Sequence, residues 1–273
     1  MNRCHLNVLP HLFIILSSLF LPSSAQAAQW RMMVGVNDFI VDQANSHTLG
    51  SGIGISFADT TESDISLFGR FNTYFDFDID ELDPDHIPIW FQSDFVAEGE
   101  LVRLTETTSI SWFAEAFDKR NTVSSVEQQQ KLMPGFDFSF NAQRYKVGTK
   151  ASAGYYALEI DDDVPTLRGY SRGDLRNSTS ALSLQLYAAV ALSEKAGVNL
   201  SAQQWHDGDD WLENQYYLTL KYDVAEQITG SLLVINIVHT EYNLDPYNDP
   251  QKLPILPWDK DTFVRVYLEY PLN

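Results

Sequence analysis

Charged side chains recur on one face of segments whose other face is apolar, and they are the residues of this chain best suited to chemistry. If the apolar faces meet lipid, the opposite faces look into an enclosed interior. A charged wall of this kind would select small polar or ionic solutes in a pore. The same charges could instead pair into salt bridges and hold a partly plugged interior in shape, and the sequence leaves both interpretations open. The residues are Arg31, Arg70, Asp94, Glu98, Glu100, Glu115, Lys146, Lys150, Lys221, Arg265 and Glu269.

Histidine offers a second kind of chemistry. Beyond residue 27 the histidines are His47, His86, His206 and His239. A hydrolase would need one of them within hydrogen-bond reach of a serine or an acidic nucleophile. His206 lies in an Asp-rich stretch and His239 precedes Glu241 by two residues, but neither spacing is specific to a catalytic site. We therefore expect no catalytic residue, no metal site and no cofactor, and an enzyme acting on lipid or peptide at the cell surface stays as an alternative.

The elements that position these side chains read as β-strands. In residues 181–192 every even position is apolar, and most odd positions are polar or amphipathic. Residues 215–222, 145–157 and 263–272 alternate in the same way, which is typical of strands with two different faces. Weaker copies of the pattern occupy residues 31–37, 52–58, 64–75, 89–102, 110–117, 135–140, 198–203 and 230–239. Together these segments predict an all-β chain of about twelve strands.

The connections between the segments also follow a pattern. Short polar turns at residues 58–63, 105–109, 141–144, 193–197 and 223–227 alternate with longer stretches that are rich in Asp, Pro and Gly. One short side and one long side predict a transmembrane, antiparallel up-and-down β-barrel with both termini on the short-turn side. A soluble periplasmic β-sandwich would also alternate apolar and polar residues, and it remains the competing fold.

The first 27 residues predict a signal peptide rather than part of the fold. Arg3 precedes an apolar stretch over residues 8–21, and Ala25-Gln26-Ala27 forms a small-x-small cleavage site. The apolar stretch is too short for a spanning helix, so an N-terminal membrane anchor is the weaker interpretation. Residues 28–273 then form the barrel domain. Cys4 leaves with the signal, and the mature chain has no cysteine for disulfide or thiol chemistry.

Composition restricts the classes of partner that this chain can bind. The formal net charge of −19 argues against nucleic acid, whose partners carry clustered Lys and Arg. Past the signal, no apolar run approaches the roughly 20 residues of a spanning helix. Mean hydropathy is −0.20, but an average hides strands that are apolar on one face only.

The signal ending at Ala27, the alternating strands and the last segment, residues 263–273, resemble the twelve-stranded outer-membrane barrels of Gram-negative bacteria. The resemblance implies localisation in the cell outer membrane, contact with its lipid and lipopolysaccharide, and a C-terminal strand read by the barrel-assembly machinery. In that group the last strand usually closes on an aromatic residue, whereas this chain ends Pro271-Leu272-Asn273. Size and strand number suit a porin-like passive channel for small polar solutes, or an autotransporter-like barrel that stands alone without a passenger.

Overall fold

The computed structural model describes residues 28–41, 46–77, 89–120, 126–160, 176–225, 228, 230–243 and 260–272. The predicted signal sequence at residues 1–27 and His86 lie outside these ranges, so the signal peptide stays a prediction. The described residues form twelve strands and no helix. This part of the chain accordingly holds no helix that is long and apolar enough to cross a membrane.

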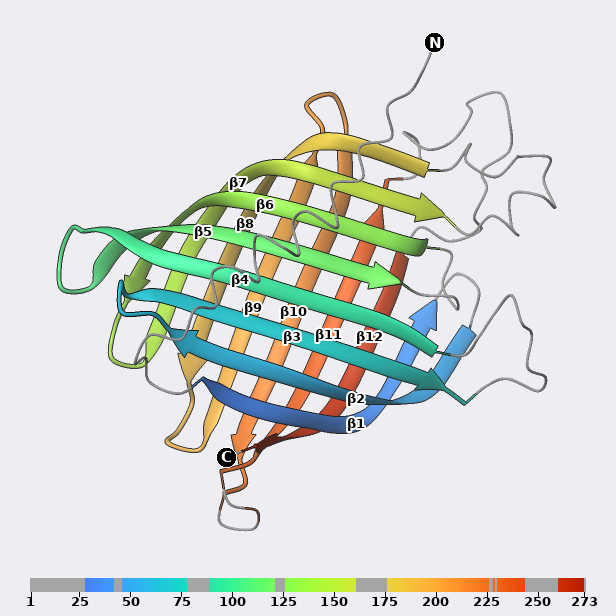
Figure 1. Ribbon diagram of the computed structural model, residues 1–273, viewed down its shortest axis with the longest axis horizontal. Helices are drawn as coiled ribbons and strands as arrows, with labels where there is room; N and C mark the ends of the chain where they lie inside the picture. The colour runs from blue at the N-terminus through green and yellow to red at the C-terminus, as the bar shows by residue number, and fades with distance from the viewer. Residues whose placement is uncertain are drawn as a thin grey trace.

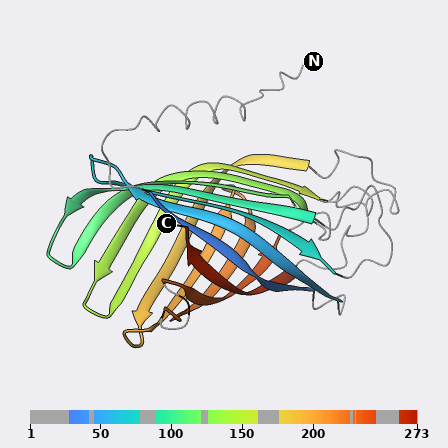
Figure 2. The same cartoon turned by 60° about the horizontal axis from the view of Figure 1, so that its bottom comes forward.

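The strands close into one antiparallel barrel in which each strand pairs with its neighbours in sequence and β1 pairs with β12 (Figures 1 and 2). The predicted all-β, up-and-down barrel is therefore confirmed, and the sandwich alternative is wrong. The strands are β1 (Gln29–Val41), β2 (Ser46–Thr60), β3 (Ile65–Asp76), β4 (Ile89–Arg103), β5 (Thr108–Arg120), β6 (Val126–Asn141), β7 (Tyr145–Ile160), β8 (Arg176–Ala191), β9 (Ala196–His206), β10 (Trp211–Asp223), β11 (Leu232–Tyr242) and β12 (Lys260–Pro271).

The seam between β1 and β12 is continuous. Its register runs from Arg31 opposite Pro271 to Ile40 opposite Thr262. The Leu272 N–H also donates to the Trp30 carbonyl at 2.9 Å, so both ends of the described chain meet at the short-turn end of the barrel. Closure leaves no edge strand, which satisfies backbone groups that would otherwise lack hydrogen-bond partners.

The two faces of the sheet differ in polarity, as the alternation predicts. On β8 the outward side chains Leu182, Leu184 and Leu186 are each more than half exposed. The outward Phe136 of β6 and Leu49 of β2 are exposed to a similar degree. A soluble protein rarely shows apolar surface on this scale, and a lipid-facing barrel requires it.

The predicted alternation of short and long connections is wrong in part. At the end opposite the short turns, three of the connections are also short: they comprise residues 42–45, 121–125 and 207–210. The connection at 207–210 is tight because the Asp207 carboxylate accepts hydrogen bonds from the backbone N–H groups of Asp209 and Asp210 at 2.9 and 2.7 Å. These bonds, the one from Asp210 above all, lower the pKa of Asp207. Gly208 completes the turn with a positive φ of 113°.

Several strands are longer than the pattern indicated. β6 begins at Val126, well before the predicted start at residue 135. Pairing with β7 is interrupted at Met133 and Pro134, because proline has no N–H to donate to a ladder. Gly154 lies across this interruption, where a Cβ would collide with the Leu132 carbonyl. Pro134 made the sequence read as if the strand began after it. In the structure β6 continues past Pro134, and the close approach of β7 at Gly154 keeps the two strands side by side there.

The turn at Gly208 gives a stability prediction. A Cβ at this φ is strained even though open space surrounds it, so Gly208→Ala should lower the free energy of unfolding by about 1–3 kcal/mol. The measurement is the urea midpoint of the refolded barrel in detergent, followed by its heat-modifiable migration on a gel. Gly197→Ala is the matched control, because its Cβ would meet only ordinary contact and its φ is not positive. Equal midpoints for the two variants would contradict the assignment of strain to Gly208.

Candidate functional site: the barrel interior

The inner face of the barrel is the candidate site. The strand register places all the charged residues predicted from the sequence at inward positions. Arg31, Glu100, Lys221 and Glu269 lie towards the short-turn end, and Arg265 lies deeper, about midway along β12. The remaining six, Arg70, Asp94, Glu98, Glu115, Lys146 and Lys150, line a common cavity. Their role in solute passage stays a prediction.

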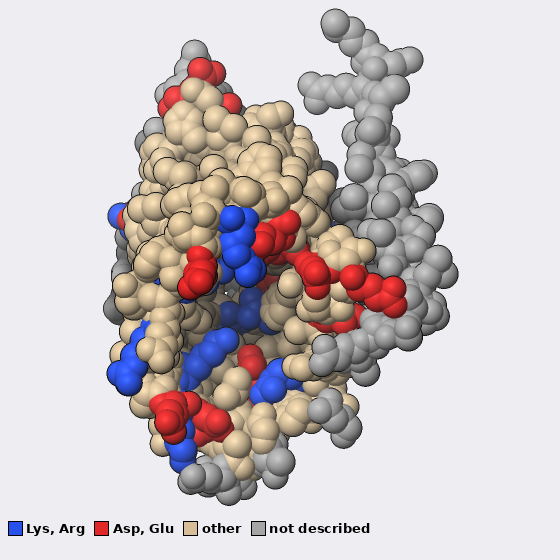
Figure 3. Space-filling view, turned by 90° about the vertical axis from the view of Figure 1, so that its left-hand side faces the viewer, with Lys and Arg blue, Asp and Glu red and all other residues tan. Residues whose placement is uncertain are grey.

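The cavity occupies the half of the interior nearer the short turns. Its volume is about 520 Å³, within the range of small-molecule sites. Figure 3 looks onto this end of the barrel and shows a hollowed mouth with basic side chains inside it and acidic side chains around it. The cavity reaches inward as far as Phe117, Lys131 and Trp205, which lie in the half of the barrel nearer the longer connections. We call this space the vestibule.

Ion pairs along the wall hold the charges of the vestibule. The Arg70 guanidinium donates to the Asp94 carboxylate at 3.0 Å, between neighbouring strands β3 and β4. The Lys150 ammonium lies 2.7 Å from the Glu115 carboxylate, and these side chains are 17% and 27% exposed. The paired charges in these contacts hold their side chains in place and largely offset one another.

A further wall contact depends on a glycine. The Tyr187 hydroxyl donates to both oxygens of the Asp137 carboxylate at 2.9 Å, and the Lys146 ammonium lies 4.0 Å from the same carboxylate. The Tyr187 side chain crosses over β7 to reach Asp137, and the β7 residue at the crossing is Gly148. A Cβ on Gly148 would lie too close to the Tyr187 hydroxyl oxygen and would collide with it. The missing side chain thus makes room for the hydrogen bond.

The inner end of the vestibule is spanned by a buried ion pair. The Lys131 ammonium of β6 lies 2.8 Å from the Glu213 carboxylate of β10, and three strands separate β6 from β10 around the barrel. Tyr156 donates its hydroxyl proton to the other Glu213 oxygen at 2.8 Å, and the Gln129 amide donates to that oxygen as well. These donors satisfy a carboxylate that is fully buried. We call this contact the transverse pair.

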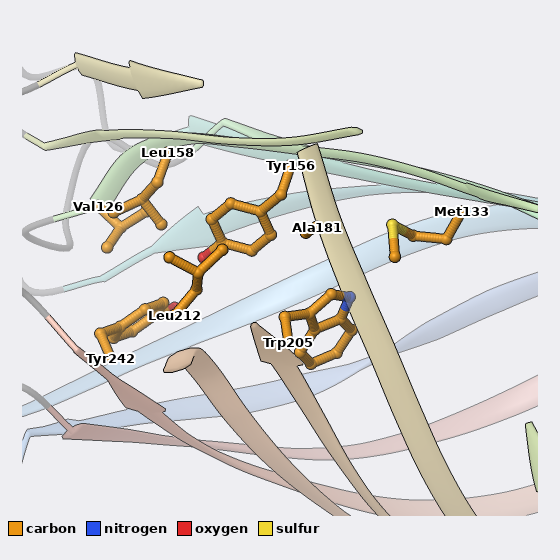
Figure 4. Close-up of a cluster of buried hydrophobic side chains, with 8 residues drawn as sticks. All are labelled: Val126, Met133, Tyr156, Leu158, Ala181, Trp205, Leu212 and Tyr242. Carbon is orange, nitrogen blue, oxygen red and sulfur yellow. The ribbon is translucent and has the colours of Figure 1, made fainter. Parts of the chain in front are cut away.

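A cluster of buried apolar side chains, shown in Figure 4, includes Trp205 and Tyr156, which contact the transverse pair. The Lys131 ammonium lies 3.5 Å from the centroid of the Trp205 ring, a close cation–π contact. A bulge in β10 turns both Leu212 and Glu213 inward, since the register with β9 shifts between Trp211 and Glu213. The cluster consists of Val126, Met133, Tyr156, Leu158, Ala181, Trp205, Leu212 and Tyr242.

A second cluster fills the opposite side of the interior at the same end. Tyr74 stacks on Trp90 with ring centroids 4.0 Å apart, and Phe263 packs on both rings at 5.0–5.2 Å. The Arg265 guanidinium donates to the Asn236 side-chain oxygen and to the Tyr74 hydroxyl, which links β12 to β3. Around the barrel, β1 and β2 lie between β12 and β3. The described side chains therefore fill much of the interior beyond the vestibule.

Sequence reasoning missed the residues of the transverse pair. Lys131 lies before residue 135 and Glu213 before residue 215, where the predicted strands began. Extending the period of two backwards from either start places both side chains inward. Asp137 was within a predicted strand but was not singled out. The polar run around Gln129 and the bulge at Leu212 interrupted the alternation and concealed the signal.

Among the residues that the structure describes, His206 and His239 do not assemble a catalytic set. His239 faces outward, where its Nδ1 lies 2.9 Å from the Thr262 hydroxyl and its Nε2 lies 3.9 Å from a Glu241 oxygen. The second distance exceeds hydrogen-bond reach, so Glu241 does not orient the ring as a triad acid would. His206 accepts a hydrogen bond from the Gly208 N–H in its turn.

Comparison with known proteins gives fold-level relatives. No family model matches the sequence, and no curated protein matches it. Among solved structures, the NanC porin matches with a TM-score of 0.51 and 9% identity, covering 88% of this chain and 100% of that chain. The KdgM porin matches with a TM-score of 0.47 and 8% identity, covering 88% and 99%. Outer membrane phospholipase A from Escherichia coli matches with a TM-score of 0.44 and 11% identity, covering 90% and 93%.

A closed antiparallel barrel with an apolar outside and a charged inside defines a class of protein. The protein is a transmembrane β-barrel, and its twelve strands form the kind of barrel found in Gram-negative outer membranes. The predicted localisation in the outer membrane is confirmed. The lipid of that membrane therefore surrounds the apolar belt.

The transverse pair gives a second stability prediction. Glu213→Ala leaves the Lys131 ammonium buried without its partner, so the free energy of unfolding should fall by about 3–5 kcal/mol. The double variant Lys131→Met, Glu213→Leu removes both charges and should recover most of that loss. Urea midpoints in detergent measure both effects. A double variant as unstable as the single one would show that the ion pair itself, rather than an orphaned charge, carries the stability.

Proposed function

We propose that the protein is a narrow passive channel for small polar solutes. The observation that carries this proposal is the vestibule, a space of about 520 Å³ with a charged and polar lining that opens at the short-turn end. Such a lining lets a polar solute exchange its hydration shell for protein groups as it enters. The vestibule ends on the transverse pair, which makes this pair the constriction of the proposed path.

The first step of a conducting path past the constriction is movement of the Lys131 side chain. Lys131 is a long, flexible side chain, and its contacts with Glu213 and with the rings of Trp205, Phe117 and Tyr156 hold it across the interior. A change of its rotamer would withdraw the ammonium towards β6. This step needs no change in the strand ladder, so the barrel stays closed while the constriction widens. Conductance through the resting barrel should accordingly be small.

A passive role is the preferred one because most of the charged groups of the interior are engaged in ion pairs. The enzyme alternative would need an oriented acid beside His239, and the 3.9 Å separation from Glu241 does not supply one.

We also propose that β12 serves as the strand read by the assembly machinery, since its outward residues Val264, Val266 and Leu268 are apolar. The pairing of β12 with both β1 and β11 fits a strand that completes the barrel.

Planar-bilayer recordings test the channel. The purified barrel should show discrete conductance steps, and Lys131→Ala combined with Glu213→Ala should raise the step size severalfold, because the side chains that span the interior are removed. Lys150→Ala combined with Glu115→Ala is the matched control. It also deletes one cation and one anion, but from a wall pair, so the rise should be smaller.

Folding of each variant is checked by heat-modifiable migration before recording. Folded wild-type protein without any conductance step would overturn the channel. An equal rise in both double variants would overturn the assignment of the constriction to the transverse pair.

A further inference from the structure

The lining of the vestibule differs from one side to the other, and this difference bears on the solute. Strands β3 to β7 contribute all of its charged side chains, namely Arg70, Asp94, Glu98, Glu115, Lys131, Asp137, Lys146 and Lys150. Strands β8 to β10 contribute amides, hydroxyls and aromatic rings. The polar side chains on this second side are Gln185, Tyr187, Asn199, Ser201, Gln203, Gln215, Tyr217 and Thr219. We call it the amide wall.

The charged side offers little to an ion. Its four cations and four acids balance, and each of the cations has an acidic partner. An entering anion would have to compete with a carboxylate already within 2.7–3.0 Å of Arg70, Lys131 or Lys150. Breaking such a pair leaves its partner uncompensated, which is costly in a confined site. Glu98 is the acid of this lining that has no ion pair within the described chain, and it disfavours anions further.

The amide wall, in contrast, has hydrogen-bonding capacity to spare. Within the part of the chain that the structure describes, the side chains of Gln185, Asn199 and Ser201 have no hydrogen-bond partner. Strand pairing sets Gln185 opposite Gln203 and sets Tyr187 opposite Ser201, so these groups form one continuous patch. An amide both donates and accepts, as a sugar hydroxyl does.

Aromatic rings complete the patch. Tyr187 and Tyr217 line the same wall, and their hydroxyls are held by Asp137 and Gln215. The hydroxyl bonds fix the rings and leave them as the apolar component of the wall. A pocket with apolar rings and a few fixed polar groups suits a solute that has both C–H faces and hydroxyl groups.

We infer that the vestibule binds an uncharged, hydroxyl-rich solute, such as a neutral mono- or disaccharide, on the amide wall of β8 to β10. This inference rests on the proposed channel, since it names the solute class of that path. The charged wall of β3 to β7 keeps the vestibule hydrated and its shape fixed, and the unpaired amides supply the recognition. A volume of about 520 Å³ accommodates a solute of this size.

Binding and conduction are measured separately to test this. Titration calorimetry on the refolded wild-type barrel should give saturable binding of sucrose and much weaker binding of lactobionate, an anion of similar size. Gln185→Ala combined with Asn199→Ala should weaken sucrose binding about tenfold, because two hydrogen-bonding groups are lost. Gln204→Ala is the matched control, since this glutamine lies on β9 but faces outward and donates a hydrogen bond to Asn214. The affinity of this variant for sucrose should equal that of the wild type.

The outcomes separate the two proposals. Sucrose binding that is lost in the double variant, in a barrel without conductance, supports the solute class and overturns the channel. Conductance steps without saturable sucrose binding, or with tighter binding of lactobionate, overturn the solute class and leave the channel standing. Sucrose binding that is unchanged in the double variant also overturns the inference, because it removes the amide wall from recognition.

Discussion

The structure depends on the pairing of β1 with β12. In lipid every backbone N–H and C=O must find a partner within the protein, and only closure of the sheet provides this for all twelve strands. Once the sheet is closed, successive side chains of each strand face the lipid and the interior in turn. The leucines of β8 and the aromatics of β6 then face outward, and the charged residues of the vestibule face the interior.

The interior meets the resulting cost of enclosed charge in two ways. Near the short turns the charges pair along the wall and stay partly hydrated, as Lys150 and Glu115 do. Nearer the other end the transverse pair is buried, and its carboxylate is satisfied by lysine, tyrosine and amide donors together. Wall pairs leave a vestibule open, whereas pairing across the interior obstructs it. The geometry of pairing, more than the number of charges, therefore sets the shape of the space.

Much of this architecture could be predicted from the sequence, because a two-faced strand has a strong and local signature. The alternation in residues 181–192 and 215–222 identified strands and assigned their faces. It could not find the beginning of β6, where Pro134 breaks the ladder, or the beginning of β10, where a bulge turns Leu212 inward beside Glu213. The sequence also suggested both a charged pore wall and a salt-bridged plug. Which charges meet across the interior depends on the stagger of the whole barrel, and no single strand carries that information.

The transverse pair joins residues that are 82 positions apart in the chain. Lys131 and Glu213 can meet only after β7, β8 and β9 have taken their places between them. A slip of register in any of these strands would leave an ammonium and a carboxylate facing apolar neighbours. The contact therefore acts as a check on assembly: a barrel with correctly staggered strands gains it, and a misaligned barrel retains two costly charges in its interior.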